Sequence, residues 1–491
     1  MMKDTIRINP ADTVAVALKD LPGIPAGHKI ALRDIAPGED IIKYGNPIGH
    51  ALRAIRKGEL VDHNNIATNL SGTLDYEDVK RDSHASLLAP NSSPLTFNGY
   101  RRAGGGTGIR NDIWVVPTVG CVDGICRQIV ERAKMEIGEQ GSSLISESSL
   151  QYFPHNYGCS QLGDDHENTR RILRDMVLHP NAGGVLVVGL GCENNQPREF
   201  EKLLGDYDRQ RIRLLICQEV EGDEVEAGAR IVRELYEQAR SDERVPVPLS
   251  SLRVGLKCGG SDGFSGITAN PLLGAFSDWL CAQGGTTVLT EVPEMFGAEH
   301  LLMRRAASDD VLQATIRLIN NFKEYYLSHG QPVGENPSPG NKAGGISTLE
   351  EKALGCTQKS GTSAVRGVLD YGERLESGAG LHLLCAPGND LVASTALAAA
   401  GCQLVLFTTG RGTPFSTFVP TLKVATNSDL ARRKPQWVDF DAGTIVSQDE
   451  PMDSVLKRFI ECVLDAVGGK PTRAEQAHIH DMAIWKNGVT L

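Results

Sequence analysis

Three cysteines stand where strand-like apolar runs give way to loops, each beside a glycine. Cys258 ends the apolar run 252–258, and Cys159 and Cys192 each directly follow a glycine. Ligands of parallel α/β sheets bind at the carboxyl edge of the strands, and glycine lets the backbone approach them closely. Three thiolates can hold an iron ion or an iron-sulfur cluster and leave one position open for a substrate oxygen. We therefore predict that Cys159, Cys192 and Cys258 are metal ligands facing one cavity.

The alternative interpretation is that these cysteines are packing residues. Cysteine is among the most buried residue types and often serves as a small apolar side chain. Each of the three cysteines, taken singly, can therefore be interpreted as a packing residue. Cys356 follows a glycine and stays a further candidate for the site. Cys121 and Cys126 are spaced too widely for a redox pair. We interpret the cysteines within apolar runs as core residues: Cys217, Cys281, Cys385, Cys402 and Cys462.

Polar side chains follow the same strand ends. Ser261 and Asp262 lie in the glycine-rich stretch 259–266, and Asn194 follows closely on one of the cysteines. Arg411 comes after a strongly apolar run, and its guanidinium can contact a carboxylate through two parallel hydrogen bonds. We predict that these four residues bind substrate. The sequence does not indicate a nucleotide-binding site, because it has neither a Walker lysine pattern nor a GxGxxG motif after a strand.

Four residues are candidates for proton transfer. Lys342 lies in a segment rich in proline and glycine, where a lysine can hold a carboxylate or, when desolvated, act as a base. Histidine is the usual acid or base near neutral pH, which makes His28, His63 and His166 candidates. The alternative interpretation is a surface lysine and packed or surface histidines. His28 and His63 gain interest because a small tethered domain can close over a larger one as a lid.

The elements that must position these residues fall into four regions. Residues 1–70 hold short alternating runs separated by Pro-Gly turns, which predicts a small β-rich domain. Residues 71–97 are polar with weak apolar periodicity and are interpreted as a linker. From there, strand-like and helical runs alternate, which is typical of parallel α/β sheets. A polar segment with prolines divides this part into domains at 98–245 and 246–491.

Composition excludes several classes of protein. The 491 residues carry a formal net charge of -11 with no basic run, so nucleic acid is not an expected partner. The longest apolar region, 392–407, is interrupted by polar residues and glycine, so we expect no membrane span. The beginning of the sequence has no apolar signal core, and the eleven cysteines are scattered. We therefore expect a cytoplasmic protein.

Seven strings along the sequence carry a family resemblance: residues 26–29, 44–49, 157–166, 189–195, 258–271, 290–299 and 336–345. They closely resemble the altronate and galactarate dehydratase family, and the likeness extends to the last residues of the sequence. The resemblance implies an N-terminal SAF-type β-clip domain, a second domain that helps to form a homodimer, and a C-terminal domain with a Rossmann-like parallel sheet. It also implies dependence on Fe(II), with Mn(II) as a possible substitute, and a place in hexuronate catabolism.

The reaction implied by the resemblance converts D-altronate to 2-dehydro-3-deoxy-D-gluconate and water. A base removes the C2 proton, the metal and cationic groups stabilise the enolate, and an acid helps the C3 hydroxyl to leave. As hypotheses, His28 or Lys342 is the base and His63 or His166 is the acid. Arg411 and Ser261 hold the substrate carboxylate.

Two alternatives stay open. The same enolate chemistry serves a dehydratase for galactarate or a sulfo-lyase for sulfolactate. A protein of another class, which binds a sugar acid or a metal without catalysis, would show binding without formation of a 2-keto acid.

Overall fold

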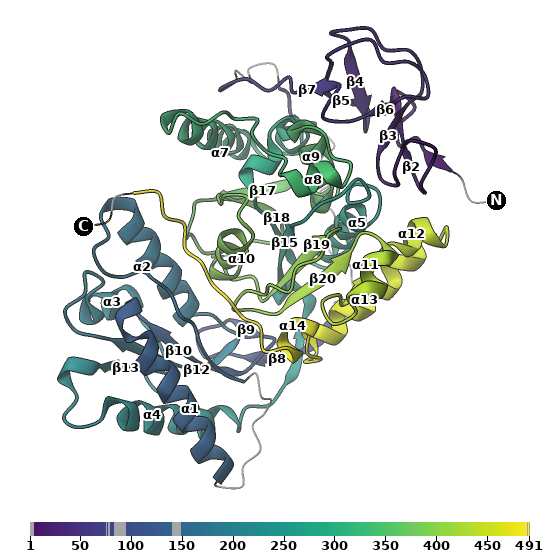
Figure 1. Ribbon diagram of the computed structural model, residues 1–491. Coiled ribbons are helices and arrows are strands. Elements are labelled where there is room, and N and C mark those ends of the chain that lie inside the picture. The colour runs from purple at the N-terminus through teal and green to yellow at the C-terminus, as the bar shows by residue number, and fades with distance from the viewer. Residues whose placement is uncertain are drawn as a thin grey trace.

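The computed structural model describes residues 4–74, 76, 79–82, 95–139, 149–376, 378–488 and 490. Figure 1 shows three units: a small β-rich N-terminal domain, a second domain at the opposite end, and a C-terminal domain between them. Most of the predicted linker, residues 71–97, lies outside the described residues.

The N-terminal domain consists of two small sheets around a core of isoleucines and valines. Short runs of alternating residues separated by glycine turns favour such strands, and the domain confirms the β-rich prediction. One sheet has the order β1-β2-β3-β6, from β1 (Thr5–Ile6), β2 (Val14–Ala17), β3 (Lys29–Ala31) and β6 (Leu60–Val61). The other has the order β4-β5-β7, from β4 (Asp40–Lys43), β5 (Asn46–Ala51) and β7 (Ile66–Ala67).

The second domain is built on a parallel sheet of order β11-β10-β12-β13. Helices α1 and α4 cover one face and share a core, while α2 and α3 cover the other. The strands are β10 (Asp112–Pro117), β11 (Leu150–Tyr152), β12 (Ala182–Gly189) and β13 (Ile212–Ile216). The helices are α1 (Asp123–Glu139), α2 (Gly163–Val177), α3 (Pro197–Leu203) and α4 (Glu224–Ala239). A separate three-stranded sheet joins this domain to the next one through β8 (Thr96–Arg101), β9 (Thr107–Gly108) and β14 (Val245–Pro248).

The C-terminal domain contains a seven-stranded sheet of order β17-β18-β16-β15-β19-β20-β21, in which every pairing is parallel. Its central strands are almost continuously apolar, as expected where helices cover both faces. The parallel α/β prediction is confirmed. The strands are β15 (Arg253–Cys258), β16 (Thr286–Leu289), β17 (Val365–Leu369), β18 (Gly380–Leu384), β19 (Leu404–Thr409), β20 (Thr421–Ala425) and β21 (Phe440–Asp441).

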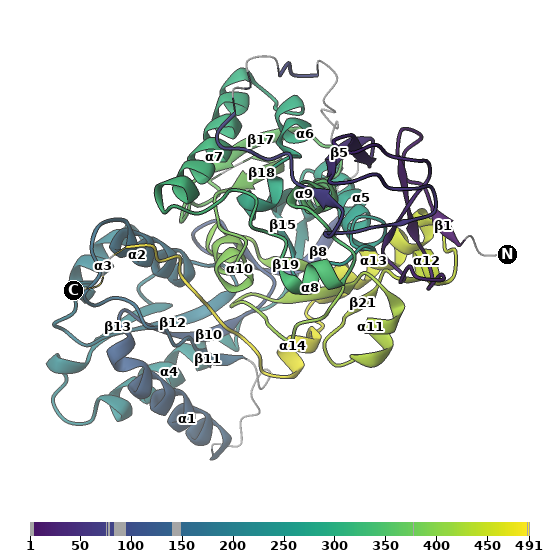
Figure 2. The ribbon, with the colours of Figure 1, turned by 45° about the horizontal axis from the view of Figure 1, so that its top comes forward.

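Helices pack on both faces of this sheet. The helix α10 lies on the face toward the second domain and packs against α2, as Figure 2 shows, while α5, α7 and α13 bury their apolar sides in the opposite core. The helices are α5 (Ala269–Ala282), α6 (Glu299–Arg304), α7 (Asp309–Ser328), α8 (Pro339–Ala343), α9 (Leu349–Cys356), α10 (Asp390–Ala399), α11 (Ser428–Arg433), α12 (Thr444–Ser447), α13 (Met452–Val467) and α14 (Arg473–Gln476).

The topology places a switch point between β15 and β19. The chain continues from β15 to its neighbour β16 on one side, and from β19 to its neighbour β20 on the other. In open α/β sheets, ligands bind outside the carboxyl ends of the strands at such a point. The glycine-rich stretch 259–266 follows β15 there.

The end of the chain returns to the second domain. After α14 the chain runs along α2 (Figure 1), where the backbone N–H groups of Asn487 and Gly488 donate to the Asp165 carboxylate at 2.9 and 2.7 Å. This contact ties the C-terminal and second domains together. Among the helices in the described ranges, none has the length and apolar character needed to cross a membrane.

Candidate active site

Three segments that are distant in the sequence meet at the glycine-rich stretch 259–266. The N–H of Gly263 donates to the carbonyl of Gly344 at 2.8 Å, which joins the stretch to the segment that holds α8. A Cβ at Gly263 would overlap the carbonyl oxygen of Gly27, from the N-terminal domain. Glycine is therefore required at position 263 for the N-terminal domain to approach this closely.

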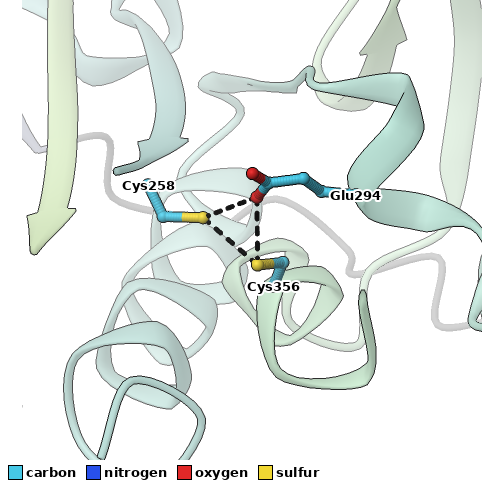
Figure 3. Close-up of side chains that lie close together, drawn as sticks. All are labelled: Cys258, Glu294 and Cys356. Atoms are coloured by element: carbon cyan, nitrogen blue, oxygen red, sulfur yellow. Dashed lines mark hydrogen bonds between the residues drawn. The ribbon is translucent and has the colours of Figure 1, made fainter. Parts of the chain in front are cut away.

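Beside this stretch, two thiols and a carboxylate converge in the interior (Figure 3). The Sγ atoms of Cys258 and Cys356 lie 3.3 Å apart, and a carboxylate oxygen of Glu294 lies 3.1 Å from each of them. All three side chains are buried. In the part of the chain that the structure describes, this is the group of cysteine, histidine and acidic side chains found with metal-ligand spacing.

Buried lysines surround these three donors. The Nζ atom of Lys359 lies 2.6 Å from the Cys258 Sγ, and that of Lys352 lies 2.7 Å from Glu294. Lys257 pairs with Glu291 and, at 2.8 Å, with Asp390. The hydrogen bond with Cys258 and burial raise the pKa of Cys356 well above its usual value, so a metal that binds this thiol would displace a proton.

The lysines act as cations in this cluster. Burial alone would lower the pKa of Lys359. The neighbouring Cys258 and Glu291 side chains outweigh burial and raise that pKa well above its usual value. Burial alone would raise the pKa of Glu294, but Lys352 and Lys359 outweigh it and lower that pKa to about 2. At neutral pH the cluster thus presents charged hydrogen-bond donors and an ionised carboxylate.

The donor set has the chemistry to hold one divalent metal ion. Two thiolates and one carboxylate suit Fe(II) or Zn(II), whereas Mn(II) favours oxygen ligands. The three ligand atoms lie within 4.8 Å of one another, which is close enough for all of them to reach one ion. An iron-sulfur cluster is a poorer fit, because clusters are held mainly by three or four cysteines.

Short turns and one buried helix position the cluster. Glu291 has a φ of 70° at the end of β16, and the 3₁₀ turn Val292–Met295 then directs Glu294 inward. Lys352, Cys356 and Lys359 recur at intervals of four and three residues, so they lie on one side of α9 and the turn after it. Sequence reasoning missed Glu294 and the lysines. The available signal was a helix in which charged residues interrupt an otherwise apolar pattern.

The structure places the two other predicted metal ligands elsewhere. Cys159 and Cys192 are exposed at the edge of the second domain's sheet, where the Ser160 N–H donates to the Asn194 Oδ1 at 2.7 Å. The prediction of one shared cavity assumed that all three strand ends belong to one sheet. The chain instead forms two separate parallel sheets, so Cys258 groups with Cys356 and Glu294.

The predicted substrate-binding residues differ in their surroundings. Among the described residues, the buried Ser261 Oγ has no hydrogen-bond partner, as expected for a group that binds a ligand. The Asp262 carboxylate accepts bonds from Thr426 and Asn427 at 2.9–3.0 Å, so it fastens the loop. The Arg411 side chain is exposed. Its backbone N–H donates to the Gly260 carbonyl at 3.0 Å, which places Arg411 beside the glycine-rich stretch.

The candidates for proton transfer divide into two groups. Lys342, on α8, and His28, whose Cα is 3.3 Å from where a Cβ at Gly345 would lie, are half-buried beside the glycine-rich stretch. His63 is exposed on the N-terminal domain. His166 lies on α2 of the second domain, where burial lowers its pKa. The structure therefore brings His28 and Lys342, but not His166, to the edge of the seven-stranded sheet.

A buried ion cluster fastens the N-terminal domain onto α9. Lys29 and Lys43 each place an Nζ atom 2.8 Å from the Glu351 carboxylate, and Lys29 also donates to the Gly345 carbonyl and the Ser347 hydroxyl. Burial alone would raise the pKa of Glu351, but the two lysines lower it to about 2. The carboxylate is therefore ionised at neutral pH and compensates the buried ammonium groups.

A small cavity lies between the N-terminal domain and the cluster. Its lining includes Tyr44, Ser261, Lys352 and Cys356, and its volume is about 10 Å³, which is room for about one water molecule. Ligand pockets usually occupy about 300 Å³ or more. As described, the cavity therefore has no room for a ligand larger than about one water molecule.

Comparison with known proteins gives matches over nearly the whole chain. Residues 22–69 match the altronate/galactarate dehydratase SAF domain, and residues 99–240 match the second domain of D-galactarate dehydratase/altronate hydrolase. Residues 249–490 match the C-terminal domain of D-galactarate/altronate dehydratase.

Individual relatives span the same length. Altronate dehydratase of Bacillus subtilis (strain 168) is 52% identical over 506 residues and covers 100% of both chains. Altronate dehydratase of Escherichia coli (strain K12) is 51% identical over 502 residues and covers 99% of both. Galactarate dehydratase (L-threo-forming) of Escherichia coli (strain K12) is 34% identical over 506 residues, which are 97% of this chain and 95% of that one.

Proposed function

Because the chain belongs to the altronate/galactarate dehydratase family, we propose that it is a hydro-lyase that converts D-altronate to 2-dehydro-3-deoxy-D-gluconate and water. The observation that carries this proposal is the buried group of Cys258, Glu294 and Cys356, ringed by lysines at the carboxyl edge of β15. The lysines around this group can place positive charge beside the enolate of a carboxylate.

The residues beside this group have distinct roles in the proposal. His28 or Lys342 removes the C2 proton, since both lie beside the glycine-rich stretch. Ser261 and Arg411 hold the substrate carboxylate. The ammonium groups of Lys352 and Lys359 stabilise the negative charge that develops on that carboxylate as the proton leaves. The closed N-terminal domain excludes water from the reaction.

Cys258, Cys356 and Glu294 would hold an Fe(II) ion, which would act as a Lewis acid toward substrate oxygens. We expect removal of iron with a chelator to abolish turnover. Fe(II) should restore more activity than Mn(II), because two of the three ligands are thiolates. Turnover and bound metal, measured after anaerobic reconstitution with each ion, check this expectation. Full activity of the metal-free protein would contradict it.

We also propose that the protein works in the cytoplasm. The cysteines in the described part of the chain are free thiols, which is compatible with a reducing compartment. We also propose a homodimer formed through the second domain. Light scattering of the purified chain would test it, and a monomer at micromolar concentration would contradict it.

The substrate is tested by assaying altronate, galactarate and sulfolactate side by side. We expect a 2-keto acid from altronate with a kcat/KM well above that for the other two acids, because the altronate dehydratases are 51–52% identical to this chain and the galactarate dehydratase 34%. A higher kcat/KM for galactarate or sulfolactate would show that altronate is not the preferred substrate. Binding without formation of a 2-keto acid would show a binding protein.

A further inference from the structure

Tyr44 occupies a backbone conformation that its residue type disfavours. Tyr44 and Gly45 form the two-residue turn between β4 and β5, with φ values of 58° and 73°. Asparagine, aspartate or glycine normally fills the first position of such a turn, because a Cβ crowds the backbone when φ is positive. Turn formation alone therefore does not account for an aromatic side chain here.

Two glycines make space for the Tyr44 ring inside the C-terminal domain. A Cβ at Gly266 would overlap the Tyr44 hydroxyl, and a Cβ at Gly355 would lie 3.6 Å from it. The ring thereby reaches the cavity that Ser261 and Cys356 also line. A side chain of the N-terminal domain thus enters the candidate active site of another domain.

Lys43 lies against the same phenol. Its Nζ is 4.8 Å from the centre of the Tyr44 ring and also pairs with Glu351 at 2.8 Å. An adjacent ammonium group stabilises a phenolate, so this arrangement helps the phenol to release its proton.

We propose that Tyr44 is the general acid that protonates the departing C3 hydroxyl of the substrate. This inference rests on the proposed function. The phenol proton moves to the C3 oxygen as the C3–O bond breaks, so that water leaves and the phenolate pairs with Lys43. The resulting enol gives its O–H proton to the phenolate, and the protonated base returns its proton to C3, which yields the 2-keto acid.

This assignment gives the N-terminal domain a chemical role in addition to closure. Because Tyr44 belongs to the N-terminal domain, the acid would be in place only while that domain covers the site, where it also shields the reaction from water. His63 and His166, the acids predicted from the sequence, are respectively on the surface of the N-terminal domain and in the second domain.

The test compares Tyr44→Phe with the iron-loaded wild-type chain on D-altronate. General acids contribute about 10²–10⁴-fold, so we expect kcat to fall by that factor with little change in KM. Exchange of the C2 proton with deuterium from solvent should persist, since the base is intact. An altronate analogue with fluorine at C3 should lose fluoride at a rate close to that of the wild type, because fluoride leaves without protonation.

Tyr371→Phe is the matched control. Tyr371 is a buried tyrosine whose hydroxyl accepts a hydrogen bond from the backbone N–H of Trp485 at 2.9 Å. It should keep kcat within a few fold. A Tyr44→Phe variant with wild-type kcat, or one that loses C2 exchange and fluoride release equally with dehydration, would overturn the acid role. Failure of the wild type on every sugar acid would instead contradict the proposed function.

Discussion

Replacing Cys356 with serine should lower kcat/KM for D-altronate by at least about 10²-fold and release most of the bound iron. Loss of residues that merely support a metal ligand typically costs about 10–100-fold, and loss of a ligand should cost more. The Cys356 thiol contacts both Cys258 and Glu294, so the serine variant lacks one of the three ligand atoms of the group. Iron content by mass spectrometry and steady-state rates would be measured on the same anaerobic sample.

Two control variants separate this role from packing. Cys402→Ser alters an equally buried thiol outside the group and should cost stability without loss of iron. Cys192→Ser alters an exposed thiol of the second domain and should leave both iron and turnover unchanged. Retention of iron by Cys356→Ser, or its loss from Cys192→Ser, would contradict the site described above.

Replacing Glu351 with alanine should destabilise the chain by about 3–5 kcal/mol, because it leaves the ammonium groups of Lys29 and Lys43 buried without a counter-ion. The pKa of Glu351 is lowered, so its stabilisation is complete above the unfolded-state pKa of about 4.3. It fades as the pH falls toward about 2. Urea unfolding at pH 7 and pH 4 would therefore give a smaller difference between variant and wild type at the lower pH.

Glu39→Ala is the control, since Glu39 pairs with Arg33 at the surface. Exposed ion pairs contribute little to stability, so this variant should resemble the wild type at both pH values. If Glu351→Ala were as stable as Glu39→Ala, the buried cluster would not be what holds the N-terminal domain in place.

Much of the fold could be predicted because its signals are local. Alternating strand-like and helical runs indicated parallel α/β sheets, and short runs between glycine turns indicated a β-rich N-terminal domain. The matches confirm the family resemblance and the SAF-type domain. The number of sheets is not a local property, because the same alternation allows one sheet or two. That gap led to the grouping of Cys159 and Cys192 with Cys258.

The site was predictable only in part. The glycine-rich stretch after β15 and the position of Cys258 followed from strand-end logic. Glu294 and Cys356 reach Cys258 from a 3₁₀ turn and a helix far along the chain, and no spacing in the sequence links them. The position of Tyr44 in the site could not be predicted, because it depends on which surfaces of two domains touch. That contact in turn depends on Gly266 and Gly355, which leave room for the Tyr44 ring.

The most direct test of the site is diffraction from iron-loaded crystals of the full chain, recorded on both sides of the iron absorption edge. The account predicts one anomalous peak within bonding distance of the Sγ atoms of Cys258 and Cys356 and a carboxylate oxygen of Glu294. A peak beside Cys159 and Cys192 instead, or no iron at the predicted position in an active crystal, would contradict it.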